Sequence, residues 1–322
     1  MAIKRPIVTL TVNPAVDKST TIERLVPDDK LRCAKPQFEA GGGGINVAKA
    51  IHRLGGEPIA VFTSGGPTGQ RLQKLVKEEN VDIMVVETKE WTRENLNIVE
   101  TTTGLQYRFS MPGTELMPTE VEAIMDTLEE ITPTPSFIIA SGSLPPGVPA
   151  NFYCQIANLA KKQGAKFIVD TSGESLRLAC DAGVYLLKPN ISELSDLIGA
   201  DKLEMDQLDE AARALIIRKN CEVVVISMGA MGAMLVTADY VEHIPAPPVA
   251  KKSTVGAGDS MVAGMVWTLS QGKSIREAVR MGIACGSAAT MNPGSELFKV
   301  QDVNRLLDWL NRYEIRYAST IR

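Results

Sequence analysis

Short apolar runs alternate with longer segments of helical periodicity along most of the chain. Six of these runs are rich in β-branched residues and bounded by Gly, Asp, Ser or Asn, which predicts buried strands over residues 6–12, 58–63, 136–141, 166–170, 184–187 and 222–227. Helical spacing predicts helices over residues 45–54, 69–79, 119–130, 151–163, 208–219, 258–271, 274–291 and 303–313. This alternation predicts an α/β fold with a doubly wound, mostly parallel sheet flanked by helices.

Two segments, residues 17–40 and 91–111, break this alternation. They show no helical period and contain many β-formers, among them Thr20, Ile22 and Tyr107. We expect them to pair into a small antiparallel sheet outside the main layer, a lid on a single domain that spans residues 1–322. The alternative is a pair of long surface loops, which are uncommon without a function of their own.

Composition narrows the function classes. The chain has 322 residues and a formal net charge of −4, so no global basic field would attract nucleic acid or an acidic membrane. Five scattered cysteines without a C-x-x-C pair predict reduced thiols in a cytoplasmic protein. The longest uncharged stretch, residues 131–160, contains five prolines, so we expect no continuous membrane helix there. The sequence also shows no secretory signal.

One motif of small residues, Thr254-Val255-Gly256-Ala257-Gly258-Asp259, stands directly before a long apolar helical segment. Small residues let the backbone turn tightly and approach a ligand. The free N–H groups and the positive dipole end of the helix would converge there, which predicts an anion site, most often for phosphate. Asp259 would lie in the first helical turn, as a functional carboxylate or only as a helix cap.

A second glycine cluster, residues 41–44, also precedes an amphipathic helical segment. Four glycines carry a large ordering cost, which close approach of the backbone to a ligand would explain; a flexible turn is the alternative. Asn46, two residues further on, can donate to and accept from a pair of ligand hydroxyls.

Three common enzyme classes do not fit the sequence. A Rossmann fingerprint would follow the first strand, where residues 13–17 read Asn-Pro-Ala-Val-Asp instead. A Walker A loop ending at residues 272–274 would need glycine where the chain has Trp267. With His52 and His243 as its two histidines, the chain is not expected to form a multi-His metal site or a Ser-His-Asp triad.

Together the two glycine sites resemble those of the ribokinase-like family of carbohydrate kinases. Residues 42–48, with Gly55 and Gly65 downstream, match the N-terminal signature of the family, and residues 254–266 match its C-terminal signature. Residues 188–193, Lys-Pro-Asn-Ile-Ser-Glu, resemble its N-x-x-E element. The resemblance covers essentially the whole chain and implies ATP and Mg²⁺ as cofactors.

The resemblance also implies roles for individual residues. Gly256, Ala257 and Gly258 would form the anion hole under the transferring phosphoryl group, with Asp259 as general base on the sugar hydroxyl. The nucleotide side would be formed by Lys188, Asn190, Ser227, Gly229, Gly232 and Ser287, with Glu193 organising Mg²⁺ through water. A monovalent cation such as K⁺ would be held by Ser253, Val255, Ala289, Asn292 and Gly294, next to Glu296, which departs from the family pattern.

Residues 13–17 resemble the branch of the family that acts on phosphosugars. By this resemblance the sugar would contact Ala15, Val16, Asp17, Gly42, Gly43, Gly44, Asn46 and Ser143. A substrate phosphate needs cations, preferably an Arg fork, and Lys30, Arg32, Arg93 and Arg108 lie in or beside the two lid segments. Arg93 is the expected ligand of that phosphate. Lys30 could instead contact the nucleotide phosphates.

Within the branch, Gly43 and residues 30–33, 91–96 and 141–147 are similar to ribokinase-type bacterial 6-phosphofructokinases. This similarity implies transfer of the γ-phosphoryl group of MgATP to the 1-hydroxyl of fructose 6-phosphate. Tagatose-6-phosphate kinase and 1-phosphofructokinase, which usually have Lys at position 43, are the alternatives. A nucleoside kinase and a non-catalytic sugar-phosphate or nucleotide sensor are the rivals from other classes, and the intact Asp259 and Glu193 disfavour the sensor.

The predicted lid sheet has consequences for assembly and for water. A small sheet exposes its edges, and pairing two lids between subunits would cover them, so we expect a homodimer through the lid. The lid would also exclude water, because hydrolysis of ATP competes with transfer. Nucleic acid and membrane are not expected partners.

Overall fold

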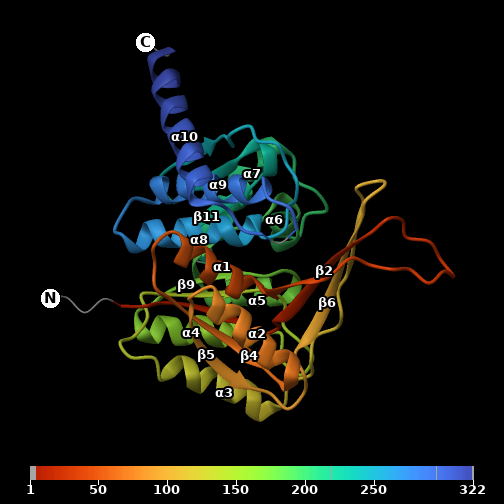
Figure 1. Cartoon of the computed structure of the whole chain (residues 1–322). Coiled ribbons are helices and arrows are strands. Elements are labelled where there is room, and N and C mark those ends of the chain that lie inside the picture. The colour runs from red at the N-terminus through yellow and green to blue at the C-terminus, as the bar shows by residue number, and fades with distance from the viewer. Residues whose placement is uncertain (1–4, 219, 295, 321–322) are drawn as a thin grey trace.

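The computed structural model describes residues 5–218, 220–294 and 296–320. Its main sheet has the order β13-β12-β11-β10-β9-β8-β1-β4-β5 (Figure 1). The strands are β1 (Ile7–Thr11), β4 (Pro58–Ser64), β5 (Asp82–Glu87), β8 (Phe137–Ser141), β9 (Lys166–Asp170), β10 (Val184–Leu187), β11 (Cys221–Ser227), β12 (Ala233–Val236) and β13 (Val241–Ile244). Pairing is parallel from β5 through β11 and antiparallel at β12 and β13.

Helices cover both faces of this sheet because its strands are apolar on both faces. On β8, Ile138 packs into the core on one face and Ile139 into the core on the other. The first face is covered by α3 (Pro118–Glu129), α4 (Phe152–Gln163), α5 (Gly173–Ala182), α6 (Ile191–Ile198) and α7 (Leu208–Ile217). The second is covered by α1 (Gly43–Arg53), α8 (Ala257–Ser270), α9 (Ile275–Thr290) and α10 (Val300–Thr320).

The predicted α/β class and the predicted strands and helices are confirmed, with most ends shifted by a few residues. The last helix, α10, continues to Thr320, beyond the predicted end at residue 313, and the predicted helix end at residue 219 lies outside the described residues. The sequence patterns did not predict α5, α6, β5, β12 and β13. Of these, α6, β12 and β13 are short, and β5 and β13 lie at the sheet edges, where half-exposed positions weaken the apolar pattern. None of the described helices is long and apolar enough to cross a lipid bilayer.

The lid is a separate sheet with the order β3-β2-β6-β7, formed by β2 (Ala15–Ile22), β3 (Gln37–Gly41), β6 (Arg93–Glu100) and β7 (Gln106–Phe109). Its strands extend away from the body of the domain (Figure 1). The outer pairs are antiparallel, as expected, but the central pair of β2 and β6 is parallel. Both strands start shortly after the parallel strands β1 and β5 and leave the main sheet in the same direction. The helix α2 (Gly66–Glu78) packs between the lid and β4.

Candidate active site

The polar residues of the candidate site meet where the parallel strands end. Ser141 ends β8, Asp170 ends β9, Lys188 follows β10 and Ser227 ends β11. The parallel register brings these ends to one edge of the sheet, and Ser141 lies directly opposite Asp170. This edge is where open α/β sheets bind their ligands.

Asp259 lies in the first turn of α8, and side chains from two other elements hold its carboxylate. Asn46 of α1 donates through Nδ2 to Oδ2 at 2.9 Å, and the Ser141 hydroxyl donates to Oδ1 at 3.2 Å. Burial among these elements raises the pKa of Asp259 to about 6, and the nearby charge of Asp170 contributes to the increase. The carboxylate is therefore ionised at neutral pH yet basic enough to take a proton.

The beginning of α8 places helix N–H groups and a buried ammonium group beside this carboxylate. Gly256 caps the helix with a φ of 70°, a left-handed conformation that favours glycine. A methyl group at Gly258 would lie 3.5 Å from the Lys188 ammonium. Lys188 is buried and pairs with Asp170 at 3.3 Å, so an ammonium group and the free N–H groups of the helix face the same space. This combination suits a phosphoryl group.

The glycines at positions 42–44 are required because site residues occupy the space where their side chains would be. A Cβ at Gly43 would clash with the Ser141 hydroxyl, and one at Gly44 with the Leu10 carbonyl. Gly42 has a φ of 130° and faces Thr11. This close packing against protein atoms argues against a merely flexible turn, while approach of the glycine backbone to a ligand stays a prediction. A side chain at Gly43 would displace the hydroxyl that holds Asp259.

Acid pH is expected to remove activity through Asp259. Because burial raises the pKa of this carboxyl to about 6, the base is progressively protonated below that pH. We expect kcat/KM to fall roughly tenfold per pH unit below about pH 6, as for a single essential base. A pH–rate profile checks this, corrected for titration of the substrate's own ionisable groups. A profile that stays flat down to about pH 4.5 would contradict the assignment.

The residues expected on the nucleotide side come from the loop after β10, from β11 and the turn that follows it, and from α9. Asn190 caps α6, and its side chain and that of Glu193 bond reciprocally to each other's backbone N–H groups at 2.9 Å. The Ser227 N–H donates to the Pro189 carbonyl, which places β11 against this cap. A Cβ at Gly286 would lie 3.1 Å from the Ala257 carbonyl, so Ser287, the next residue, lies beside the start of α8. Gly229 and Gly232 flank a short turn between β11 and β12.

The donor set around Lys188 fits Mg²⁺ bound together with a phosphate ligand. Within the described part of the chain, no three His, Cys, Asp or Glu side chains group as a closed metal cage. Mg²⁺ is usually held by one or two carboxylates plus phosphate oxygens and waters, and Glu193 keeps Oε1 outside its capping bond.

The residues expected to hold a monovalent cation lie in two neighbouring loops. The Ser253 hydroxyl donates to the Gly294 carbonyl at 2.7 Å and accepts from the Val255 N–H at 3.2 Å. Asn292 is buried and donates to the carbonyl groups of Ala288 and Leu297. Ala289 belongs to the same helix-to-loop transition, so the structure brings all five predicted residues together.

A cleft of about 560 Å³ lies between the lid and these loops. Its lid side is polar because Asp17, Asn95 and Arg108 lie on one face of the strands, and its other side includes Val255 and Gly294. Ala15 and Val16 begin β2 and are buried. The cleft therefore connects the lid residues to the loops that end at α8.

The four predicted cations have different positions. Arg93 donates to the carbonyl groups of Asn13 at 3.0 Å, Pro14 at 3.4 Å and Met111 at 2.8 Å, so backbone atoms already occupy part of its guanidinium. Lys30 and Arg32 belong to the segment between β2 and β3, and neither lines the cleft. The segment that carries them extends away from the body (Figure 1), and their contact with a substrate stays a prediction.

Ser143 lies near the Arg93 end of the site. Asn13 donates through Nδ2 to the Ser143 hydroxyl at 3.1 Å. This contact joins the loop after β1, where Arg93 also binds, to the loop after β8. The expected sugar ligand Ser143 is thus within reach of the same loop as the expected phosphate ligand.

Sequence reasoning missed Ser141, Asp170 and Asn95. Ser141 and Asp170 each end a predicted strand, so the rule that ligands bind at the carboxyl ends of parallel strands could have indicated them. Asn95 stands two residues after Arg93 and therefore on the same face of a strand, a signal that the alternation of strand side chains carries.

Comparisons with known proteins agree with this geometry. Residues 6–300 match the model of the pfkB family of carbohydrate kinases. The chain is 43% identical over 307 residues to the ATP-dependent 6-phosphofructokinase isozyme 2 of Escherichia coli strain K12, with coverage of 95% of this chain and 99% of that protein. The crystal structure of Escherichia coli phosphofructokinase-2 in complex with potassium is 42% identical and matches with a TM-score of 0.92, over 95% of this chain and 99% of that one.

Two further structures extend the comparison. The same Escherichia coli protein in complex with fructose 6-phosphate matches with a TM-score of 0.89 at 41% identity, over 95% of this chain and 99% of that one. A ribokinase of Arabidopsis thaliana shares the fold, with a TM-score of 0.74 at 21% identity over 95% of this chain and 99% of that one. The chain belongs to the pfkB family of carbohydrate kinases and has the ribokinase-like fold.

Proposed function

We propose that the protein is an ATP-dependent 6-phosphofructokinase that transfers the γ-phosphoryl group of MgATP to the 1-hydroxyl of fructose 6-phosphate. The observation that carries the proposal is the Asp259 carboxylate, held by Asn46 and Ser141 at the positive start of α8. The Escherichia coli 6-phosphofructokinase, which this chain matches over nearly its full length, supports the choice of acceptor.

In the proposed reaction Asp259 removes the proton of the acceptor hydroxyl as its oxygen bonds to the γ-phosphorus. The bond between that phosphorus and the β–γ bridging oxygen breaks, and ADP leaves with the electron pair. Phosphoryl transfer needs positioning and charge neutralisation more than covalent chemistry. Here the Gly256–Gly258 amides and the Lys188 ammonium would stabilise the negative charge that develops.

Mg²⁺ would be held through Glu193 and the nucleotide phosphates, and it would neutralise phosphate charge. Asn190 keeps Glu193 in place through the cap of α6. K⁺ would bind between the loops of Ser253 and Gly294 and shape the start of α8, which follows Val255 directly. The potassium complex of the Escherichia coli relative supports this part of the proposal.

Asp17, the glycine run and Ser143 would bind the sugar, and Arg93 its 6-phosphate. Arg108 faces the same cleft from β7. Free cysteines, three of them buried, accord with a reducing cytoplasm, where the proposed enzyme would find MgATP.

Replacing Arg93 by alanine is expected to weaken binding of the sugar phosphate far more than binding of ATP. A charge-assisted bond to phosphate and the three backbone bonds would be lost together, so we expect KM for fructose 6-phosphate to rise roughly 10- to 100-fold with KM for ATP within about twofold. Steady-state kinetics with each substrate varied in turn checks this. Arg93→Lys keeps the charge without the fork and should recover part of the loss. Equal losses for both substrates would reassign Arg93 to a structural role alone.

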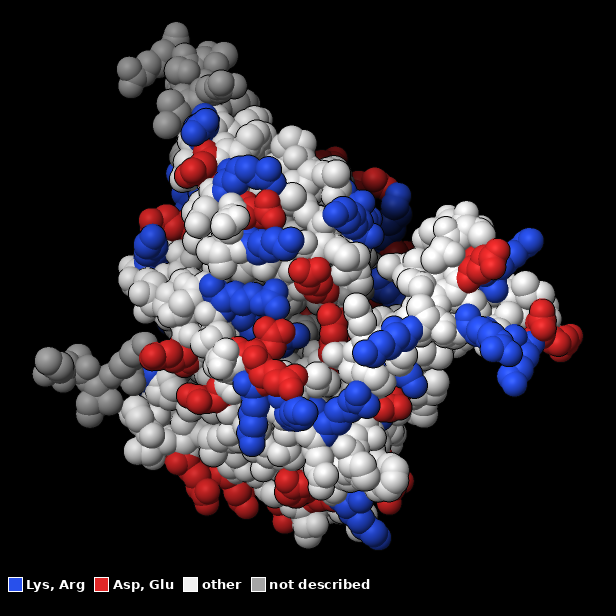
Figure 2. Space-filling model, in the orientation of Figure 1, with Lys and Arg blue, Asp and Glu red and all other residues white. Residues whose placement is uncertain are grey.

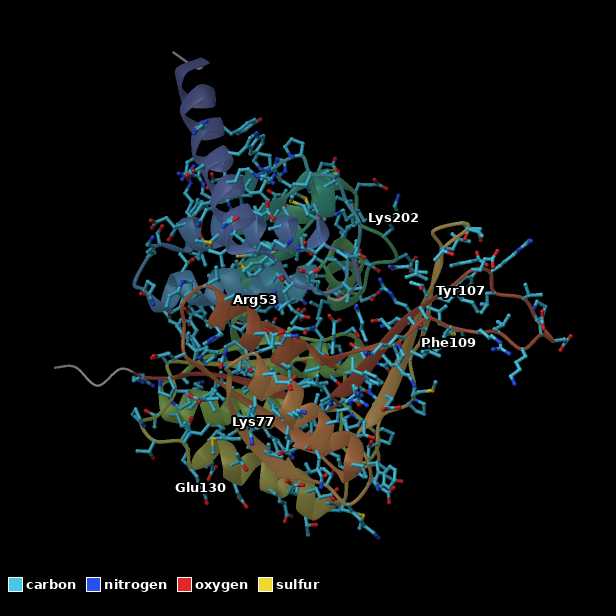
Figure 3. The ribbon with its side chains drawn as sticks, viewed as in Figure 1. Arg53, Lys77, Tyr107, Phe109, Glu130 and Lys202 are labelled. Carbon is cyan, nitrogen blue, oxygen red and sulfur yellow. The ribbon has the colours of Figure 1, made fainter. Side chains whose placement is uncertain are left out.

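We also propose that two chains associate through their lids. Leu105 and Phe109 are 55% and 42% exposed, and Tyr107 and Phe109 lie on the lid, away from the body (Figure 3). Both signs of charge gather at the outer end of the lid (Figure 2), where Lys30 and Arg32 belong to the segment between β2 and β3. In a dimer these two residues would be available to the partner's site.

Light scattering at micromolar concentration is expected to give the mass of a dimer. Phe109→Asp should shift the mass towards one chain of 34.8 kDa, because a buried charge opposes an apolar interface. Glu130→Gln, on the opposite side of the domain (Figure 3), is the control and should leave the mass unchanged. A wild type that scatters as a monomer would refute the dimer.

A coupled ADP-release assay tests the proposed function. The acceptors are fructose 6-phosphate, tagatose 6-phosphate, fructose 1-phosphate, a nucleoside and free sugars, each with MgATP. We expect the highest kcat/KM with fructose 6-phosphate. Preference for tagatose 6-phosphate or fructose 1-phosphate would keep the chemistry and change the substrate. Binding of ligand without turnover of any acceptor would support a sensor and overturn the proposal.

A further inference from the structure

Asn95 lies in the middle of the lid's polar face and uses both ends of its amide. On β6 it stands directly opposite Asp17 of β2. Its Nδ2 donates to Asp17 Oδ1 at 2.8 Å, and its Oδ1 accepts from the Met111 N–H at 3.1 Å. These two partners fix the orientation of the amide, because exchanging oxygen and nitrogen would break both bonds.

Met111 is held from the same strand a second time. Arg93, two residues before Asn95, donates through Nη1 to the Met111 carbonyl at 2.8 Å. Both polar atoms of the Met111 backbone are therefore bound to side chains of β6. These two bonds hold the segment after β7 against β6. The same strand therefore positions both Asp17 and residue 111.

The surroundings make the ionisation of Asp17 depend on its neighbours. Burial raises the pKa of Asp17, the bond from Asn95 lowers it, Glu39 of β3 raises it, and Arg93 of β6 and Lys49 of α1 lower it. Lys35, Arg108 and Glu296 face the same cleft. Among these groups, Asn95 is the one whose hydrogen bond to the carboxylate directly favours the charged form.

We infer that Asn95 is a positioning residue for the acceptor sugar: it holds Asp17 as an oriented, charged acceptor of the sugar hydroxyls and locks residue 111 beside it. The inference rests on the proposed function, because it takes Asp17 as the ligand of the sugar. A carboxylate that accepts hydrogen bonds from two hydroxyls must hold its lone pairs in fixed directions. The Asn95 amide donates to one lone pair of Asp17, and this bond directs the other lone pairs into the cleft.

Two substitutions separate the two bonds of Asn95. Asn95→Asp has nearly the same shape and still accepts from the Met111 N–H, but it places a second carboxylate against Asp17. Asn95→Ala removes both bonds. For each variant we expect kcat/KM for fructose 6-phosphate to fall roughly 10- to 100-fold at about pH 8, with KM for ATP within about twofold.

The pH dependence of the two variants should have opposite signs. Two adjacent carboxylates share one proton as the pH falls, so in Asn95→Asp the ratio of variant to wild-type KM for the sugar phosphate should decrease as the pH is lowered. In Asn95→Ala the pKa of Asp17 rises without its donor, so the same ratio should increase as the pH is lowered. A purely structural role would give ratios that do not change with pH.

The control is Glu94→Gln, which alters the neighbouring, exposed residue on the other face of β6 and should leave the kinetics within about twofold of wild type. Wild type is measured first on the panel of acceptors. No turnover of any sugar phosphate by wild type would contradict the proposed function. Active wild type with unchanged Asn95 variants, or pH-independent ratios, would overturn this inference alone. If Asn95→Ala does not fold, the nearly isosteric Asn95→Asp decides the question.

Discussion

Replacing Asp259 by asparagine is expected to lower kcat by roughly 10²–10⁴. The amide has the shape of the carboxylate and can still accept from Asn46 or Ser141, so the geometry at the start of α8 is kept. It cannot take a proton from the acceptor hydroxyl. Burial opposes ionisation of Asp259, so the neutral variant should unfold at a temperature no lower than that of wild type at about pH 8.

Single-turnover and steady-state rates at saturating substrates measure the effect of this change. KM for ATP should stay within about threefold, because the anion hole and Lys188 are untouched. The residual activity should also lose the acid limb near pH 6, because the group that causes it is gone. Wild-type turnover in Asp259→Asn, or an acid limb that persists, would remove Asp259 from the reaction.

Much of this site could be predicted because many of its residues belong to short local motifs. Ordering a run of glycines before a helix costs conformational entropy. Such a run therefore indicates a place where the backbone must turn sharply or pack closely. In the structure Gly43 has the close contact and Gly256 the left-handed backbone that the motifs indicate. The N-x-x-E element is likewise local, since Asn190 and Glu193 bond to each other across one helical turn. Such motifs place their own side chains and need little of the remaining fold.

The residues that the sequence did not reveal depend on contacts between distant segments. Ser141 meets Asp259 of helix α8 across 118 positions of the chain, and Asn95 meets Asp17 across 78. One residue of slip between β2 and β6 would turn Asn95 away from Asp17, and nothing in a single strand specifies its partner. The backbone partners of Arg93 were missed for the same reason, since they lie in two loops that come together only around the lid.

Replacing Lys188 by methionine is expected to affect both stability and catalysis. Lys188 is 7% exposed and pairs with Asp170 at 3.3 Å. Burial alone would lower the pKa of Lys188, but Asp170, Glu193 and Asp259 together raise it, so the ammonium is charged in the fold. Its removal leaves three carboxylates without their shared cation, and breaking a buried pair in this way costs about 3–5 kcal/mol of the free energy of unfolding.

The catalytic loss in Lys188→Met should follow from two effects. Phosphoryl transfer loses a positive charge beside the start of α8, which we expect to lower kcat roughly 10²–10³-fold. Lys188 also lowers the pKa of Asp259, so without it the acid limb of kcat/KM should move above its wild-type position near pH 6. Denaturant titration, steady-state kinetics and the pH profile measure the three changes on the same preparation.

A second substitution distinguishes stability from chemistry. The variant with both Lys188→Met and Asp170→Leu also removes the carboxylate that pairs with Lys188, and apolar replacement of a buried pair is often neutral for stability. We expect it to regain most of the lost free energy of unfolding while its kcat stays low. If kcat returned together with stability, the buried pair would serve the fold only, and the positive charge at the start of α8 would have to come from the helix alone.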